Sequence, residues 1–188
     1  EYYLPDILPY LVEANEKVVL VGALPEEILG INDRLQLAAA EQIFRASRAR
    51  KLMEAGATLI DPSRVDIRGE VECGEDVVID INVIFQGKVK LGDGVWVGAN
   101  SCISNSTVGA HTAVHPMTIL DGAVVDSSCS IGPFARLRPG TIISRNAKVG
   151  NFVETKNASL GEASKANHLA YLGDVKIGAS SNIGAGTI

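Results

Sequence analysis

The sequence is poor in the residues on which several classes of protein depend. Its 188 residues include 3 Cys, 3 His and 1 Trp, and aromatic residues make up 5% of the chain. Lys and Arg number 17 against 22 Asp and Glu, a net charge of -5, so we expect no nucleic-acid partner recognised through a basic surface. No apolar run approaches the ~20 residues of a membrane span and no signal peptide is recognisable, so we expect no membrane partner.

The few cysteines and histidines do not form a recognised metal or disulfide motif. Cys73, Cys102 and Cys129 lack a C-x-x-C spacing. We interpret them as small apolar residues of a protein from a reducing compartment, and we expect a cytoplasmic location. His111 and His115 have the spacing H-x3-H, but a third metal ligand is not evident, so we interpret both as structural or surface residues.

What the sequence has in abundance is a six-residue repeat from Val65 to Val149. Neither the 3.6-residue period of a helix nor the 2.0-residue period of a strand produces it, whereas a parallel β-helix does. Three hexads make a triangular turn of roughly eighteen residues, so about seven turns are expected. Two hexads, 103–107 and 114–118, look one residue short. The row that we expect to point inward contains Val65, Val71, Val77, Val83, Val89, Val95, Ser101, Thr107, Ala113, Ile119, Val125, Ile131, Leu137, Ile143 and Val149.

The residues before the repeat have a different pattern. A partial helix between Tyr2 and Val12 and a short strand at 17–21 cannot build a core alone, so they indicate the end of an α/β domain. The segment 33–55 has no Gly or Pro and predicts one long helix, capped by Asn32 and ended by Gly56. The chain begins with Glu rather than Met, which suggests a fragment. We therefore divide it into residues 1–34, a linker helix at 35–55, and a β-helix at 56–188 that is incomplete at its C-terminus.

Stacking of the coils places some chemically interesting residues together. Arg138 and Lys156 are three hexads apart, and adjacent parallel strands lie ~4.8 Å apart, so these two cations repel unless an anion lies between them. A phosphate site therefore competes with the alternative of two solvated charges, which Glu154 could offset. His168 points outward near this pair, where a neutral imidazole suits a general base, although it could also be a surface histidine. The backbone of Gly184-Ala185-Gly186 could hold a thioester oxygen or a pantetheine amide, or could serve packing alone.

Several segments resemble a known family. The segments at 132–140, 149–154, 164–173 and 182–187 are similar to the bacterial bifunctional N-acetylglucosamine-1-phosphate uridylyltransferase/glucosamine-1-phosphate acetyltransferase. Residues 30–37 resemble that family's domain junction, and residues 1–6 a segment of its uridylyltransferase domain. The resemblance implies that the β-helix is left-handed, that residues 1–34 end the uridylyltransferase domain, and that the protein is a homotrimer with active sites shared between subunits.

The resemblance also implies an activity and residue roles. The family transfers acetyl from acetyl-CoA to glucosamine 1-phosphate, then uridylyl from UTP, giving UDP-N-acetylglucosamine for peptidoglycan and lipopolysaccharide synthesis. By position, the general base matches His168, the acetyl-CoA contact matches Ala185, the Mg²⁺ and UDP-N-acetylglucosamine ligand matches Asn32, and the sugar-phosphate contacts match Arg138, Lys156, Tyr171 and Asn182.

The chain also departs from the family pattern. The Gly-rich nucleotide loop of the family is missing, Pro5 stands where Thr is expected, and the chain stops at Ile188 where the family continues with coils that bind coenzyme A. Two alternatives stay open. One is another hexapeptide-repeat acyltransferase or metal-dependent enzyme, such as a carbonic anhydrase of this fold, which needs three histidines around a metal. The other is a trimerising fragment without catalysis.

Overall fold

A computed structural model describes residues 3–188, which form two compact units that divide between residues 41 and 42. The first unit contains η1 (Leu4–Asp6), α1 (Ile7–Glu13), η2 (Pro25–Ile28) and the first turns of α2 (Arg34–Glu54). Glu1 and Tyr2, where the predicted partial helix begins, lie outside the described residues. Pro9 is tolerated because it stands in the first turn of α1, where a helical N–H has no intrahelical partner.

The strand predicted at 17–21 is wrong. The chain has no regular structure there, and Leu20 and Val21 are 97% and 83% exposed. A single apolar segment forms a strand only beside a partner, and the described part of the first unit contains no other strand. The apolar run therefore resembles a strand in composition but lacks the neighbour that would pair with it.

Helix α2 forms where the absence of Gly and Pro predicts it, but its cap differs from the prediction. The Asp33 carboxylate accepts a hydrogen bond from the Gln36 N–H at 2.8 Å, so Asp33 caps the helix. The Gln36 side chain in turn accepts from the Asn32 N–H at 2.6 Å, which leaves Asn32 one residue outside the cap position. At the other end Gly56 has φ of 100°, the left-handed conformation typical of a residue that ends a helix.

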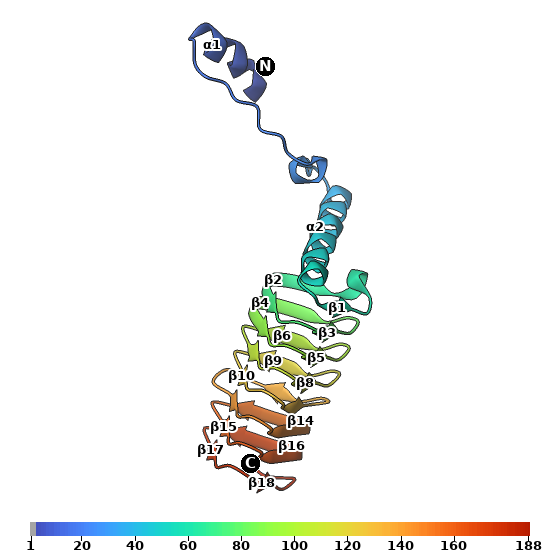
Figure 1. Ribbon diagram of the computed structural model, residues 1–188, viewed down its shortest axis with the longest axis vertical. Coiled ribbons are helices and arrows are strands. Elements are labelled where there is room, and N and C mark those ends of the chain that lie inside the picture. Colours follow the sequence, from blue (N-terminus) through green and yellow to red (C-terminus); the bar gives the residue numbers. More distant parts are fainter. Residues whose placement is uncertain (1–2) are drawn as a thin grey trace. The chain divides into compact units, whose positions relative to one another are not determined.

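The second unit is a parallel β-helix, as the six-residue repeat predicts (Figure 1). Its strands pair in parallel with strands one coil before and after, on three sides of the coil. A short helical turn, η3 (Pro62–Arg64), precedes the first long strand. The eighteen strands are β1 (Thr58–Leu59), β2 (Asp66–Cys73), β3 (Val78–Ile79), β4 (Ile84–Leu91), β5 (Trp96–Val97), β6 (Cys102–Ser104), β7 (Thr107–Val108), β8 (Ala113–Val114), β9 (Ile119–Asp121), β10 (Val124–Val125), β11 (Ser130–Ile131), β12 (Arg136–Leu137), β13 (Ile142–Ile143), β14 (Lys148–Lys156), β15 (Ser159–Leu160), β16 (Lys165–Gly173), β17 (Lys176–Ile177) and β18 (Asn182–Ile183).

The register explains both the long repeat and its interruptions. Ile67 pairs with Phe85 and Phe85 with Ile103, at intervals of eighteen residues. Ile103 then pairs with Leu120 at an interval of seventeen, so this coil is one residue short. The short hexad predicted at 103–107 is confirmed, because the inward residues Ile103 and Val108 are five apart. The one predicted at 114–118 is wrong: Val114 and Leu120 are six apart, and the second short hexad lies at 120–124.

The shortened coils correct part of the predicted inward row. Thr107 and Ile119 are exposed and Ala113 is half-buried, whereas Val108, Val114 and Leu120 are buried beside them. Side chains alternate between the two faces of a strand. After a coil that is one residue short, every sixth residue of the predicted row therefore points outward instead of inward. The rest of the row points inward as predicted, with only Val71 partly exposed.

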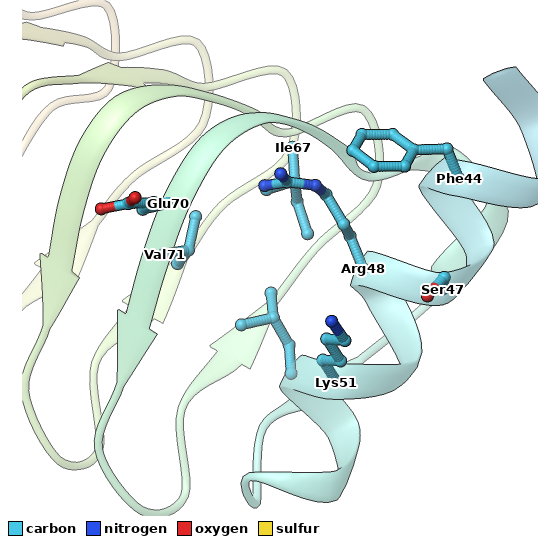
Figure 2. A pocket seen from close by; sticks show the side chains of 8 residues that line it. Phe44, Ser47, Arg48, Lys51, Ile67, Glu70 and Val71 are labelled. Atoms are coloured by element: carbon cyan, nitrogen blue, oxygen red, sulfur yellow. The ribbon is translucent and has the colours of Figure 1, made fainter. Parts of the chain in front are cut away.

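The C-terminal half of α2 covers the open first coil, with Ala49 and Leu52 buried (Figure 2). The Arg48 guanidinium donates to the Gly69 carbonyl and lies 4.6 Å from the centre of the Phe44 ring. A cavity of about 290 Å³ remains between this face of the helix and Val71. The helix thus shields a coil edge that would otherwise expose unpaired backbone groups.

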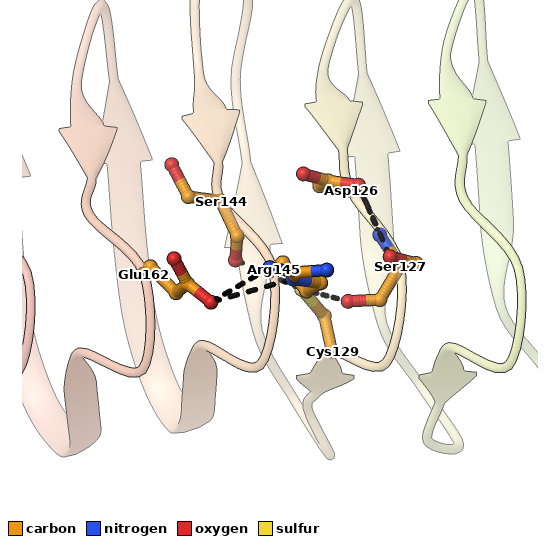
Figure 3. Close-up of polar contacts among 6 residues, drawn as sticks. All are labelled: Asp126, Ser127, Cys129, Ser144, Arg145 and Glu162. Carbon is orange, nitrogen blue, oxygen red and sulfur yellow. Dashed lines mark hydrogen bonds and ion pairs between the residues drawn. The ribbon is translucent and has the colours of Figure 1, made fainter.

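Polar contacts at the corners tie neighbouring coils together (Figure 3). Arg145 lies 3.2 Å from Glu162 on the next coil. The Asp126 carboxylate accepts from the Ser127 N–H at 2.6 Å, and this hydrogen bond lowers the pKa of Asp126. Cys129 is buried beneath this corner, 3.2 Å from the Ser144 carbonyl, and burial raises the pKa of its thiol. Cys129 therefore behaves as a small core residue, in line with the interpretation from the sequence.

Candidate functional site

Arg138 and Lys156 lie on adjacent coils at the end of one side of the β-helix. Leu137 pairs with Thr155, and the Arg138 N–H donates to the Thr155 carbonyl at 2.9 Å, which sets the two following residues beside each other. The Arg138 Nη1 atom lies 2.9 Å from Glu154 Oε1, and each of these side chains is about one-third exposed, at 35% and 34%. The stacking of Arg138 and Lys156 predicted from the repeat is thus present, and the Glu154 carboxylate partly neutralises their positive charge.

Tyr171 joins these residues from the coil above. Glu154 pairs with Tyr171, and Lys156 pairs with Gly173. The tyrosine ring lies over Gly173, because a Cβ atom placed there would be 2.7 Å from Tyr171 Cε1 and 2.8 Å from its hydroxyl oxygen. A glycine beside Lys156 therefore gives room for the phenol. We call Arg138, Glu154, Lys156 and Tyr171 the Arg138 cluster.

His168 lies on the neighbouring side of the coil, because β14 pairs with β11 on the side of Asn151 and with β12 on the side of Lys156. It is exposed and pairs with Asn151, which stands five residues before Lys156 on the same strand. Phe152, with a φ of 57°, turns the chain between Asn151 and Lys156, so these two residues stand on either side of a corner. The expectation that His168 lies within reach of the cation pair stays a prediction, since strand pairing gives the coil and the side of each residue but not the distance between their side chains.

Asn182 and Ala185 lie on the last coil, near His168. Asn182 pairs with Lys165, and the Gly186 N–H donates to the Leu169 carbonyl at 2.6 Å, which places Ala185 above His168. Both residues are exposed. We call His168, Asn182 and Ala185 the His168 group. The predicted residues of the β-helix thus form two groups on neighbouring sides of the coil.

An exposed apolar corner, which the sequence analysis missed, runs beside His168. It consists of Met117, Phe134, Phe152 and Leu169, which are 48%, 46%, 56% and 60% exposed. All four have left-handed φ angles, between 51° and 58°, and the two phenylalanine rings stack with centres 5.3 Å apart. Each is the fourth residue of its hexad, a position held by Asn or Gly elsewhere in the column, and this substitution is the signal that could have identified them.

The two earlier histidines have structural contacts. His115 Nε2 lies 3.0 Å from the Ser130 hydroxyl, and its ring meets Trp96 edge-on at 5.7 Å. The His111 ring covers Gly94, where an added Cβ would be 2.6 Å from Nδ1. Across residues 3–188 no group of three or more His, Cys, Asp or Glu side chains is arranged to hold a metal ion. The geometry of these two histidines therefore gives no support to the carbonic-anhydrase alternative.

The remaining candidate residues have less to do with this site. Asn32 belongs to the first compact unit, where it precedes α2 and is exposed. Burial raises the pKa of the Cys73 thiol to about 11, which makes it a poor nucleophile near neutral pH. Among the described helices, none combines the length and the apolar character needed to cross a membrane.

Comparison with known proteins adds the following. No family model matches the chain. The chain is 49% identical over 189 residues to the bifunctional protein GlmU of Burkholderia thailandensis and 51% identical to that of Acinetobacter baylyi. Both alignments cover 100% of this chain and 42% of the relative, so the chain spans about two-fifths of the length of the curated relatives it matches.

A solved structure has a similar fold. A variant of AntD, an N-acyltransferase from Bacillus cereus crystallised with dTDP and coenzyme A, matches with a TM-score of 0.51 and 14% sequence identity. The match covers 58% of this chain and 77% of that chain. At this level of identity it supports the β-helix fold alone.

Proposed function

On the premise that this chain corresponds along its whole length to part of the GlmU family, we propose that it carries the acetyl-transfer half of that bifunctional enzyme. Identities of 49% and 51% to GlmU proteins confirm the family expected from the motifs. The proposed reaction moves an acetyl group from the thioester of acetyl-CoA to the amine of glucosamine 1-phosphate. The observation that carries the proposal is the Arg138 cluster.

The Arg138 cluster has the chemistry to bind a sugar phosphate. A guanidinium, an ammonium and a phenol meet at the end of one side, and only one carboxylate, Glu154, opposes the two cations. A phosphate dianion can accept hydrogen bonds from all three donors, and charge-assisted bonds to Arg are among the strongest in proteins. Glu154 also holds Arg138 in place before the ligand arrives, which reduces the entropy lost on binding.

His168 is proposed as the general base. The amine nitrogen attacks the thioester carbonyl, the C–N bond forms, and the C–S bond breaks to release coenzyme A. The imidazole of His168 takes the proton that leaves the amine, and the departing sulfur is protonated to the thiol. The exposed backbone around Ala185, next to His168, is proposed to contact acetyl-CoA.

The orientation of the two groups favours a site shared between subunits. They lie on neighbouring sides of the coil, and the chain turns at Phe152 between them. We therefore propose a homotrimer in which the His168 group of one subunit faces the Arg138 cluster of its neighbour. The apolar corner beside His168 supports this arrangement, because four exposed apolar side chains in a row are typical of a subunit contact.

Acetyl-transfer kinetics on a protein of the full GlmU length test these roles. His168→Ala should lower kcat by roughly 10²–10⁴-fold and leave the KM for the sugar within a few-fold. Arg138→Ala should mainly raise that KM, and Lys90→Ala, which removes a cation bonded to Glu72 on the outer surface, should change neither. Wild-type turnover by His168→Ala from pH 6 to 9 would return His168 to the surface-residue alternative.

Co-expression of two impaired variants tests the shared site. A mixture of His168→Ala and Arg138→Ala subunits contains trimers in which one intact His168 faces one intact Arg138, so part of the activity should return. Trimers made of either variant alone contain no such pair. Mixed trimers that stay as impaired as the separate variants would place both residues of one site on the same chain. If the wild type showed neither acetyl transfer nor a Tm shift with coenzyme A and glucosamine 1-phosphate, the non-catalytic trimerising fragment would be the better description.

The other activity of the family concerns the first compact unit. We propose that residues 1–34 end the uridylyltransferase domain, and that residues 35–55 link it to the β-helix at 56–188. The Asn32 side-chain amide is exposed and its oxygen is of the kind that Mg²⁺ prefers, so it fits as one ligand of a metal ion that positions UTP or UDP-N-acetylglucosamine. Asn32→Ala should reduce uridylyl transfer and leave acetyl transfer unchanged. A cytoplasmic location is proposed for the whole enzyme.

A further inference from the structure

Four arginines gather where α2 meets the first coil. Two cavities of about 530 and 410 Å³ lie there, and both are lined by Arg45 and Ser63. Arg50 lines the first cavity, and Arg64 and Arg68 line the second. We call these four arginines with Ser63 the arginine pocket. It is separate from the Arg138 cluster, because the ladder Ile84, Cys102, Ile119, Arg136 places three coil steps between them.

The charge of the arginine pocket is poorly balanced. Among the described residues that line the two cavities, Asp66 is the only acidic one. It faces Arg45 Nε at 3.4 Å and Arg68 Nη2 at 2.6 Å, and its side chain is 13% exposed. Arg64 donates to the neutral Asn82 side chain at 3.1 Å. Asp61 lies beside the pocket as well, since its carboxylate accepts from the Ser63 hydroxyl at 2.7 Å, so four guanidinium groups and two carboxylates leave about two positive charges in a chain whose net charge is -5.

One donor in the pocket also lacks a hydrogen bond. Arg45 Nε is buried and lies 3.4 Å from Asp66 Oδ1, but it makes no hydrogen bond of good geometry to it. An acceptor brought by a ligand could supply that hydrogen bond. Arginine forks match phosphate oxygens in pairs, and cavities of this size are typical of small-molecule sites. We propose that the arginine pocket binds a small molecule that carries phosphate groups.

Binding there would join two parts of the fold. Arg45 and Arg50 come from α2, whereas Arg64 and Arg68 come from η3 and β2. A ligand held by both sets links the helix to the first coil and therefore stabilises the end of the β-helix that α2 covers. Removing one charge-assisted contact should weaken binding about tenfold or more.

Titration with inorganic pyrophosphate at constant ionic strength tests the proposal on the whole chain, by calorimetry and by the shift in Tm. Arg50→Gln and Arg64→Gln each remove a guanidinium that forms no ion pair within 4.0 Å among the described residues, although Asp61 acts on Arg64 from farther away, so they should weaken pyrophosphate binding about tenfold and abolish most of the Tm shift. The matched control Arg145→Gln removes an arginine paired with Glu162 on a distant coil and should bind like the wild type.

A second comparison separates this pocket from the proposed sugar-phosphate site. Binding that survives in Arg138→Ala and is lost in Arg50→Gln and Arg64→Gln supports the arginine pocket. Binding lost in Arg138→Ala and kept in the other two overturns it, and so does the absence of any binding. Citrate that binds as tightly as pyrophosphate would show selection for carboxylates and would overturn the assignment to phosphate.

Discussion

Two adjacent valines in β10 offer a direct test of which side chains fill the β-helix. Val125 is 1% exposed and Val124 is 50% exposed, although they are neighbours in the same two-residue strand. Val125→Asp and Val124→Asp therefore make the same chemical change on opposite faces. We expect the first to destabilise the chain severely and the second to be tolerated.

The magnitude follows from the surroundings of each side chain. Removing a fully buried valine side chain from the core loses about 1.5–3 kcal/mol of transfer free energy. An unpaired polar group at that position adds about 1–3 kcal/mol by the measure of protein mutations. The sum, about 3–6 kcal/mol, is a large part of the 5–15 kcal/mol that roughly spans the stability of natural domains. Val124 faces outward between Thr107 and Ile142, where substitution should cost no more than about 1 kcal/mol.

Urea denaturation followed by far-UV circular dichroism at pH 7 and pH 4 gives the comparison. Burial disfavours the charged form of the new carboxyl at position 125 and so raises its folded-state pKa above the unfolded value. A raised folded pKa contributes stability at low pH that is lost as pH rises, so Val125→Asp should recover part of its loss at pH 4. The exposed carboxyl of Val124→Asp should show no such recovery. Equal urea midpoints for the two variants at both pH values would refute the inward and outward assignment.

Three further predictions concern other parts of the molecule. Gly173→Ala should displace the Tyr171 ring and raise the KM for the sugar about 2–10-fold, whereas Gly178→Ala, with open space around it, should leave the KM unchanged. Burial raises the pKa of the Cys73 thiol from 9.0 to about 11 in the folded chain, so this thiol ionises at lower pH in the unfolded chain. The urea midpoint should therefore fall as pH rises from 9 to 11, and Cys73→Ala should reduce this fall. Phe152→Asn keeps a residue suited to left-handed φ but removes an exposed apolar ring, so sedimentation should show subunit dissociation at least tenfold easier than in the wild type.

The fold could be predicted because a β-helix repeats its geometry in the sequence at a fixed interval. Inward positions recur with each side, so a long run of valines at every sixth residue is typical of this fold and of few others. The exceptions arose where the interval changed. Thr107 and Ile119 belong to the predicted row but point outward, because the coil that contains them has seventeen residues instead of eighteen. Only the burial of their neighbours Val108 and Leu120 reveals this shift.

For a similar reason, only part of the candidate site could be predicted from the sequence. The stacking of Arg138 on Lys156 depends only on the number of residues in a coil, which the repeat supplies. The placement of His168 relative to Lys156 depends on how the chain turns at Phe152 and Leu169, and a count of hexads gives the coil without the direction in which each side chain points. The role of Gly173 could not be foreseen either, since it follows from the direction of the Tyr171 ring one coil away from Lys156.

The apolar corner connects these observations with the proposed assembly. A left-handed φ costs a residue with a side chain roughly 1–2 kcal/mol, and Asn82, Asn100 and Gly186 in the same column are residue types that adopt it more readily. Met117, Phe134, Phe152 and Leu169 therefore carry a combined cost of about 4 kcal/mol or more, because each bears the penalty separately. The stack of Phe134 on Phe152 returns only about 0.5–1.5 kcal/mol within one chain. Burial of the remaining exposed area against a neighbouring subunit would offset the difference at about 25 cal/mol per Å², which is why this corner, next to His168, is where we expect the subunits to meet.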